Sequence, residues 1–169
     1  FDIQTSIPLL VLLRDLLKIA SNRKEIKNAL NSKSIVLNGK IAKNEKQSVT
    51  IFDTIGIIPS KKYYKLSLSE IGKFTLDETK EEESKYKISK IIDKKILKGK
   101  RIQINLIDGR NFITDLKCNT QDSVVINFKE GKIMKCLPLK EKAKIMVFAG
   151  KHSGKMGTIN KVDLSKKMV

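Results

Sequence analysis

The sequence predicts an α+β fold in which β-structure dominates and the helices are confined to the beginning of the chain. Helical spacing of apolar residues is clear only before residue 32. After that point, short strand-like runs are joined by turn signals of the kind found in β-hairpins, at Asn38-Gly39, Asp108-Gly109 and Glu130-Gly131. The 169 residues fit one domain, two domains or three small modules.

The first helix is expected over residues 6–20. Ser6 stands just ahead of Pro8, which is typical of a helix start. Few polar side chains follow, and they fall on one narrow stripe at helical spacing: Arg14, Asp15 and Lys18. We therefore expect this helix to be mostly buried.

A second helix is expected from Asn22 to about Asn31. Asn22 and Glu25 have the spacing of a capping box, in which Asn replaces the more usual Ser or Thr. One face of this helix is apolar, with Ile26, Ala29 and Leu30. The opposite face carries Lys24, Lys27 and Asn31 and is expected to point outward.

The next residues favour a hairpin followed by further strands. Asn38-Gly39 supplies both positive-φ positions of a type I′ turn between residues 35–37 and 40–43, and "FDTIGI" (52–57) follows as a closing strand. After Pro59, strands are expected in "KYYKLSL" and "GKFTL", joined around Gly72. The acidic run 77–83 is expected to hold one helical turn, started by Thr79 and Glu82.

Two later hairpins complete the β pattern. They are predicted in "RIQINLIDGRNFITDL" and in "SVVINFKEGKIMKCL". The segments "FDTIGI" and "QDSVVI" share an aspartate, a hydroxyl residue and aliphatic residues in the same order. We interpret them as two similar strand starts, although the pattern is too short to establish a repeat.

The charge of the chain indicates a polyanionic partner. Lys and Arg number 35 against 18 Asp and Glu, for a formal net charge of +17, which exceeds what solubility requires. The densest stretch, residues 84–101, holds eight basic residues and a single Asp93. Such a run is either a solvated face or a contact for phosphates.

Other classes of site and location are disfavoured. The apolar run 7–13 is too short for a membrane span, which needs about 20 residues. Cys118, Cys136 and the lone His152 form no metal-ligand cluster, so we expect no metal and no cofactor. The two separated cysteines fit a reducing cytosol.

The glycine-rich stretch "VFAGKHSGKMGTI" (147–159) is not a nucleotide-binding P-loop. A P-loop has four residues between its first Gly and its Gly-Lys pair, whereas Gly150 and Gly154 enclose three. Met156 stands where a P-loop needs Ser or Thr, and the residues that follow are strand-like instead of helical. No nucleotide hydrolysis is therefore expected.

Taken in order, these features resemble the small-subunit ribosomal protein S-four-e family of archaea and eukaryotes. The resemblance covers nearly the whole chain and depends on the two-helix module with its Asn-Gly hairpin, the lysine-rich region with "DGRN", and "GKHSGKMGTI". It implies a two-helix plus β-hairpin RNA-binding domain (1–58), a central β-rich basic domain (59–141), and strands of an SH3-like barrel that carry a KOW motif (142–169).

The resemblance also implies details at particular positions. Asn22-Arg23 stands where the first domain of the family usually has Ser-Arg, and Asn for Ser keeps the helix cap. The family has a basic N-terminal extension and more sequence after the KOW strands. Since this chain begins at Phe1 and stops soon after the glycine-rich loop, we expect parts of a longer protein to lie outside it.

The function implied is a non-catalytic constituent of the small ribosomal subunit, in the cytoplasm, that binds and stabilises folded ribosomal RNA. Its partners would be that RNA and neighbouring ribosomal proteins, with no membrane. Two alternatives stay open. The chain could belong to an RNA-modifying enzyme that uses the first module as its targeting domain, although pseudouridine synthases need an Arg-Leu-Asp context and Asp15 lies within "LLRDLL". It could also be a KOW-type transcription or translation factor.

The candidate RNA-binding residues are the cations and loop residues of these modules. We expect the planar fork of Arg23 to hold phosphate oxygens in two places. His152 is expected to donate to phosphate or lie on the loop surface, and not to bind metal. The complete set is Arg14, Lys18, Asn22, Arg23, Lys24, Lys27, Lys33, Asn38, Lys40, Lys90, Lys94, Lys95, Lys100, Arg101, Arg110, Lys151, His152 and Lys155.

Overall fold

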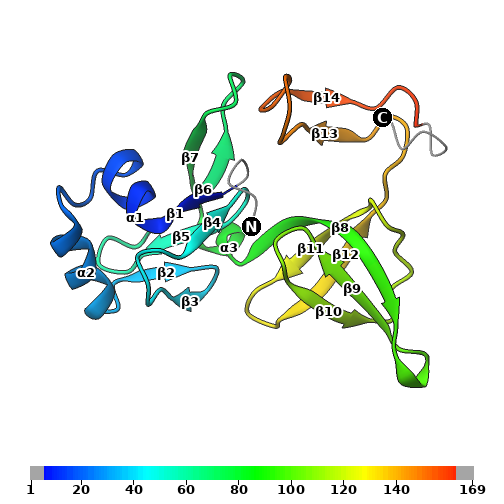
Figure 1. Ribbon diagram of the computed structural model, residues 1–169, viewed down its shortest axis with the longest axis horizontal. Helices are drawn as coiled ribbons and strands as arrows, with labels where there is room; N and C mark the ends of the chain where they lie inside the picture. Colours follow the sequence, from blue (N-terminus) through cyan, green and yellow to red (C-terminus); the bar gives the residue numbers. More distant parts are fainter. Residues whose placement is uncertain (1–5, 163–169) are drawn as a thin grey trace. The chain divides into compact units, whose positions relative to one another are not determined.

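The structure, a computed structural model, describes residues 6–162, which divide into two compact units (Figure 1). Of these residues, the first unit takes those up to Ser69 together with Lys73–Lys87. The second unit takes Glu70–Gly72 and the described residues from Ile88 onward. The division therefore falls within one long strand, β8 (Tyr86–Ile96).

The first unit is built on an antiparallel sheet in the order β3-β2-β5-β6-β7. These strands are β2 (Ile35–Leu37), β3 (Lys40–Ile41), β5 (Thr54–Ile57), β6 (Lys62–Leu68) and β7 (Phe74–Thr79). A second, short ladder joins β1 (Ser6–Pro8) to β4 (Ser48–Thr50). The Asn-Gly hairpin is confirmed, because Asn38 and Gly39 have φ of 52° and 75°.

The first helix starts later and ends earlier than the sequence pattern predicts. Ser6 does not cap a helix; it lies in β1, which pairs with β4. Pro8 has extended backbone angles, and the chain turns helical only at α1 (Leu9–Val11), continuing as a π-helical segment, Leu12–Leu16. Lys18 then adopts a left-handed φ of 51°, which ends the helix before Ala20.

The second helix agrees closely with the prediction. Helix α2 (Arg23–Asn31) has Asn22 as its N-cap, and the Glu25 N–H donates to Asn22 Oδ1 at 3.0 Å. In a standard capping box the Glu25 side chain would accept from the cap residue's own N–H. Here its carboxylate accepts from the N–H of Ser21, at 2.8 Å.

Both helical segments pack on the sheet to form the core of the first unit (Figure 1). The segment with Leu9, Leu12 and Leu13 is buried, as predicted, and Arg14, Asp15 and Lys18 are exposed. The remaining core residues come from α2 and the strands: Ile26, Leu30, Ile35, Leu37, Ala42, Val49, Ile55 and Leu66.

The domain boundary predicted at residue 58 lies inside this sheet. Strand β6 pairs with β5 from Thr54↔Lys65 to Ile57↔Lys62, and Leu66 on β6 is fully buried in the core. The single helical turn, α3 (Glu81–Ser84), lies in the acidic run as expected, although its N-cap is Lys80 and not Thr79. Residues 59–87 therefore fold with the first module, apart from the hairpin tip.

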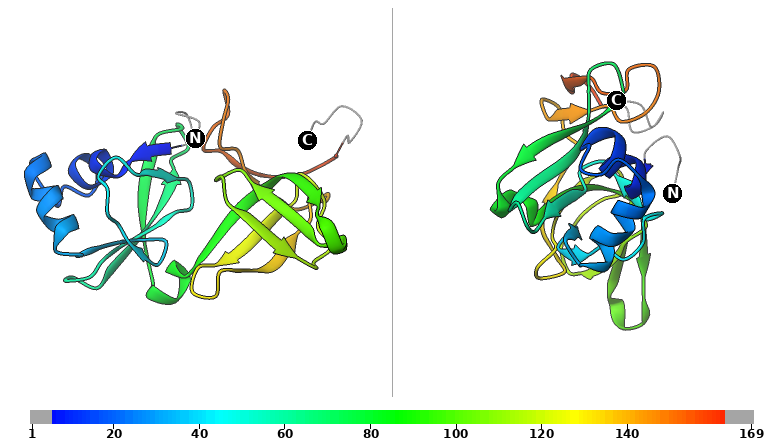
Figure 2. Two further views of the ribbon diagram at one scale, coloured as in Figure 1. Left: turned by 60° about the horizontal axis from the view of Figure 1, so that its bottom comes forward. Right: turned by 90° about the vertical axis from the view of Figure 1, so that its left-hand side faces the viewer.

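The second unit contains a curled antiparallel sheet in the order β10-β9-β8-β11-β12 (Figure 2). Its strands besides β8 are β9 (Ile102–Leu106), β10 (Asn111–Thr114), β11 (Ser123–Asn127) and β12 (Lys132–Leu137). Both predicted hairpins are confirmed. The curled sheet encloses Ile91, Ile104, Leu106, Cys118, Val124 and Ile126. A separate hairpin follows, formed by β13 (Lys144–Met146) and β14 (Met156–Thr158).

A particular turn precedes strand β5. Phe52 has a φ of 66°, and the Asp53 N–H donates to the carbonyl of Thr50 at 3.0 Å. Phe52 and Asp53 then both oppose Leu66 on β6, since the Phe52 N–H donates to Leu66 O and the Leu66 N–H donates to Asp53 O. This is a tight turn that runs into a β-bulge whose first residue is left-handed.

The same turn and bulge recur three more times in the described part of the chain. Each has a left-handed residue at the first bulge position and a partner residue on the opposite strand. In the three recurrences, the left-handed residue and the residue opposite it are Gln121 and Ile91, Lys142 and Ile159, and Gly154 and Val147. The similarity of "FDTIGI" and "QDSVVI" is thus confirmed as a shared strand start, and the sequence pattern understated how often it occurs.

Candidate nucleic-acid interface

The predicted cations of the first unit lie mainly on its surface. Lys18, Lys24, Lys27, Lys33 and Lys40 are all exposed. Helix α2 holds two of them on its outward face because its apolar residues are turned into the core. This helix therefore presents positive charge to solvent, as predicted.

Two of the predicted arginines are already paired with carboxylates. Arg14 donates to Asp15 through Nε at 2.7 Å and through Nη2 at 2.9 Å. This hydrogen-bonded pairing raises the pKa of Arg14 and lowers that of Asp15. Arg23 directs Nε and Nη2 at Oε1 of Glu45, and this hydrogen bonding holds the Glu45 pKa below its usual value. Asp15 is thus the partner of a neighbouring arginine.

Asn38 is not a surface residue, contrary to its inclusion among the candidates. Its side chain is buried, with Nδ2 donating to Asp53 Oδ1 at 2.7 Å and Oδ1 accepting from the Thr54 N–H at 3.0 Å. It ties the hairpin turn to strand β5. The Asn-Gly signal reports backbone angles, which Asn38 has, but it does not report where the side chain points.

Lys87 is also interior, although it belongs to the densest basic stretch. Its ammonium donates to Asp53 Oδ1 and to Thr50 Oγ1, both at 2.7 Å. The side chains of Lys87 and Asp53 are only 2% and 5% exposed. Lys87 is therefore neither part of a solvated face nor available to phosphates, the two interpretations of residues 84–101, because its charge is already compensated inside the first unit.

The other cations of this stretch differ in exposure. Lys95 and Arg101 are exposed, and Lys90 is half-buried. Lys94 is also half-buried, and its ammonium donates to the carbonyl of Cys118 at 3.0 Å. The side chain of Lys100 lies outside the described parts of the structure.

Arg110, near the turn of the β9–β10 hairpin, has partners of its own. Its guanidinium lies 4.7 Å from the centre of the Phe128 ring, and its Nε is 3.8 Å from Asp108 Oδ2. The side chain is only partly exposed. The contacts with Phe128 and Asp108 hold the guanidinium near the turn, while the side chain stays partly exposed.

The glycine-rich loop between β13 and β14 has the backbone expected of a sharp turn. Gly150 and Gly154 have φ of 88° and 87°, and Lys151, His152 and Lys155 are exposed. Gly157 differs from the other two glycines, since it lies within β14 and has no positive φ. The loop therefore displays three basic side chains on a fixed backbone.

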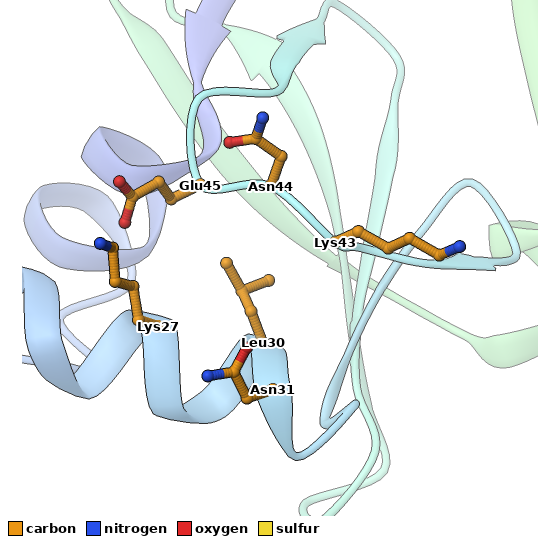
Figure 3. A pocket seen from close by; sticks show the side chains of 6 residues that line it. All are labelled: Lys27, Leu30, Asn31, Lys43, Asn44 and Glu45. Carbon is orange, nitrogen blue, oxygen red and sulfur yellow. The ribbon is translucent and has the colours of Figure 1, made fainter.

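A shallow pocket in the first unit was not predicted. It has a volume of about 430 Å³ and lies between α2 and the loop that joins β3 to β4 (Figure 3). Its lining residues are Lys27, Leu30, Asn31, Lys43, Asn44 and Glu45. Only Lys27 was a candidate, because the pocket brings together residues whose spacing in the sequence shows no motif.

Residues 6–162 offer no cluster of three or more His, Cys, Asp or Glu side chains that could hold a metal ion. Across the same residues, no helix has the length and apolar character required to cross a membrane. What the described surface offers is dispersed positive charge on rigid β-rich modules. The class of protein so defined is a basic, multi-module binder of a polyanion.

The particular family follows from comparison with known proteins: the chain belongs to the S4e family of ribosomal proteins. The sequence profile of ribosomal family S4e matches residues 60–133. The small ribosomal subunit protein eS4 of Methanothermobacter thermautotrophicus is 32% identical over 97% of this chain and 68% of its own length. The eS4 protein of Nanoarchaeum equitans is 36% identical over 93% of this chain and 67% of its own.

The fold comparison agrees with this family. The crystal structure of the 30S ribosomal protein S4e from Thermoplasma acidophilum matches with a TM-score of 0.80 at 29% sequence identity. The match covers 94% of this chain and 82% of the other. The predicted family and the predicted mostly-β fold class are both confirmed. The chain spans about two thirds of the length of its curated relatives (68% and 67%).

Proposed function

We propose that this chain is a structural constituent of the small ribosomal subunit, where it binds folded ribosomal RNA through cationic surfaces on both of its units. The observation that carries the proposal is membership of the S4e family, whose curated members are named as small-subunit proteins. Its partners are then small-subunit RNA and adjacent ribosomal proteins, and its location is the ribosome in the cytoplasm.

The surface charge supports this function. Folded RNA presents phosphates, 2′-hydroxyls and a wide, shallow minor groove, so a scaffold protein needs spaced cations on rigid elements more than base-reading grooves. Exposed cations of this kind stand on α2, on β8 and in the loop between β13 and β14: Lys24, Lys27, Lys95, Lys151 and Lys155.

The proposal requires no catalysis. Asp15, the aspartate that an RNA-modifying enzyme would have to use, is exposed and engaged by Arg14. The loop 150–157 forms a turn between two strands, and strand β14 stands where a phosphate-binding loop would need a helix. A KOW-type transcription factor would need a polymerase-binding surface, and no observation on the described residues indicates one.

The test is association with the small subunit and its dependence on salt. The protein should sediment with small subunits, and its affinity for small-subunit RNA should fall linearly with log salt concentration. Replacing Lys90, Lys94 and Lys95 with Gln should flatten that slope by up to roughly one unit for each phosphate that the variant no longer neutralises. Lys129→Gln, at an exposed lysine outside the candidate set, should leave it unchanged.

One result would contradict the proposal, and another would assign RNA binding to other surfaces. Release from subunits at low salt would mean that the protein is not a constituent. An unchanged slope in the triple variant would show that this part of β8 is a solvated face, and the RNA would then have to bind the other surfaces. Of the three lysines, Lys95 should contribute most, because Lys94 already donates within the protein.

A further inference from the structure

Glu45 carries a carboxylate oxygen that the described protein leaves without a partner. The side chain is 7% exposed, although it lies in a loop between two short strands. Its Oε1 accepts from both Nε and Nη2 of Arg23. Its Oε2 is buried and has no hydrogen-bond partner among residues 6–162. Such a buried acceptor is unfavourable unless something donates to it.

This carboxylate lies in the wall of the shallow pocket beside α2 (Figure 3). Leu30 and Lys27 point from the helix toward the loop, and the ammonium of Lys27 is directed at the Glu45 carboxylate. Lys43 lines the side of the pocket opposite Lys27 and Glu45, its side chain extends away from them, and Asn31 and Asn44 contribute amides. The site thus combines an apolar patch, an acceptor and two flanking cations.

The ionisation state of Glu45 limits what it recognises. Hydrogen bonding by Arg23, with added attraction from Lys27 and Lys46, lowers the Glu45 pKa, so the group is ionised at neutral pH. An ionised carboxylate only accepts hydrogen bonds. A ligand that complements this site presents N–H or O–H donors to Oε2 and negative charge to Lys27 and Lys43.

We propose that this pocket takes one unpaired guanosine of the RNA, whose entry turns the Glu45 carboxylate so that its buried Oε2 accepts from the N1–H and the 2-amino group of guanine, while Lys27 and Lys43 meet the adjacent phosphates. The inference depends on the proposed RNA-binding function and adds base selectivity to it. In cytosine and adenine the amino group is flanked by a ring-nitrogen acceptor, which the carboxylate repels. Guanine presents two neighbouring donors, and uracil offers only one.

The experiment measures binding of the intact chain to four labelled five-nucleotide RNAs, U₂XU₂, in which X is guanosine, inosine, adenosine or uridine. Inosine keeps N1–H but lacks the 2-amino group. Fluorescence anisotropy should show guanosine bound about tenfold or more tightly than adenosine or uridine, as expected for hydrogen bonds to a charged group, with inosine between them.

Two variants locate the effect. Glu45→Gln should abolish the preference for guanosine while leaving the salt slope unchanged. Lys43→Gln should weaken all four RNAs alike and keep the preference. Glu78→Gln, on an exposed position of β7, is the matched control and should behave as the parent does. Circular dichroism checks that each variant is folded.

If the parent binds all four RNAs equally, the inference is overturned and the proposed function stays intact. Equal binding is what we expect if the pocket holds a segment of another protein instead of a base. A guanosine preference that survives in Glu45→Gln overturns it as well, since the base is then read elsewhere. Failure to bind any RNA, including small-subunit RNA at low salt, contradicts the proposed function itself.

Discussion

At the scale of single residues, the left-handed backbone positions show where a residue other than glycine can be accommodated. Gly154 occupies the first position of a bulge that Phe52, Gln121 and Lys142 occupy elsewhere. A side chain is therefore tolerated in this geometry, but at a cost of about 1–2 kcal/mol for ordinary residues.

We expect Gly154→Val to destabilise the β13–β14 hairpin by at least this amount, because Val is branched at the β-carbon and Gly154 is buried. Hydrogen exchange at the Val147 amide should accelerate, since this amide bonds to Lys155 O at 2.9 Å across the bulge. Gly157→Ala is the control, and it should change stability by less than about 0.5 kcal/mol because its site is open. Equal effects of both changes would contradict the assignment of strain to Gly154.

A second residue-scale prediction concerns the cysteines. Burial raises the pKa of the Cys136 thiol to about 12, and the neighbouring Cys118 thiol and Asp122 carboxylate add to the shift. The reactive thiolate is therefore scarce at neutral pH. Alkylation by iodoacetamide at pH 7.5, followed by mass spectrometry, should be more than about a hundredfold slower in the folded protein than in urea. Comparable rates would mean that the thiol is exposed.

Residue types showed the overall charge but not the partner of each charge. Arg23, Lys87 and Asn38 were all assigned to the surface or to RNA, and each has an intramolecular partner. Those partners, Glu45 and Asp53, are 15 or more positions away in the sequence. Since ion pairing depends on tertiary contact, the sequence pattern alone could not reveal it.

At the scale of elements, the strand starts differ in one chemical detail. The carboxylates of Asp53 and Asp122 accept from the backbone N–H three residues earlier, from Thr50 at 2.7 Å and from Asn119 at 2.9 Å. The start of β13 has the same backbone, but Ala143 stands at the aspartate position. That turn therefore lacks the side-chain hydrogen bond.

We expect Ala143→Asp to stabilise the turn before β13 by about 0.5–1.5 kcal/mol, because the new carboxylate would accept from the Lys140 N–H. The measurement is hydrogen exchange of the Lys140 amide, which should become slower. Ala143→Leu serves as the control that adds bulk without an acceptor. Slower exchange in both variants would attribute the effect to packing and not to the hydrogen bond.

Elements with strong local signals were predictable, and those made by distant pairing were not. Helix α2 and its Asn22 cap agree with the sequence, as do the hairpins at Gly39, Gly109 and Gly131. Strands β1 and β4 have three residues each, too few to show alternation, and they exist because they pair with each other. Pairing with β5 also places β6, which follows residue 58, in the sheet of the first unit.

For the molecule as a whole, the buried pair of Lys87 and Asp53 is the interaction whose removal should matter most. Replacing Lys87 with Met would leave the Asp53 carboxylate buried without its counter-charge. Breaking a buried ion pair in this way typically costs about 3–5 kcal/mol. Lys95→Met, on the exposed part of the same strand, should cost less than about 0.5 kcal/mol.

Urea unfolding followed by circular dichroism would compare the two variants with the parent. The transition of the first unit should shift to lower urea in Lys87→Met, and Lys95→Met should match the parent. A destabilisation below about 1 kcal/mol in Lys87→Met would show that Asn38 and Thr50 alone satisfy the Asp53 carboxylate, through the hydrogen bonds that they donate to it.

The position of Lys87 also sets an order of events during synthesis. Ribosomes deliver a chain from its N-terminus, and N-terminal parts generally fold first. Asp53 emerges 34 residues before its cation. A nascent chain that ends before residue 87 would have to enclose the Asp53 carboxylate without its counter-charge. The first unit is therefore completed only when the opening residues of β8, which are also its last residues, have left the exit tunnel.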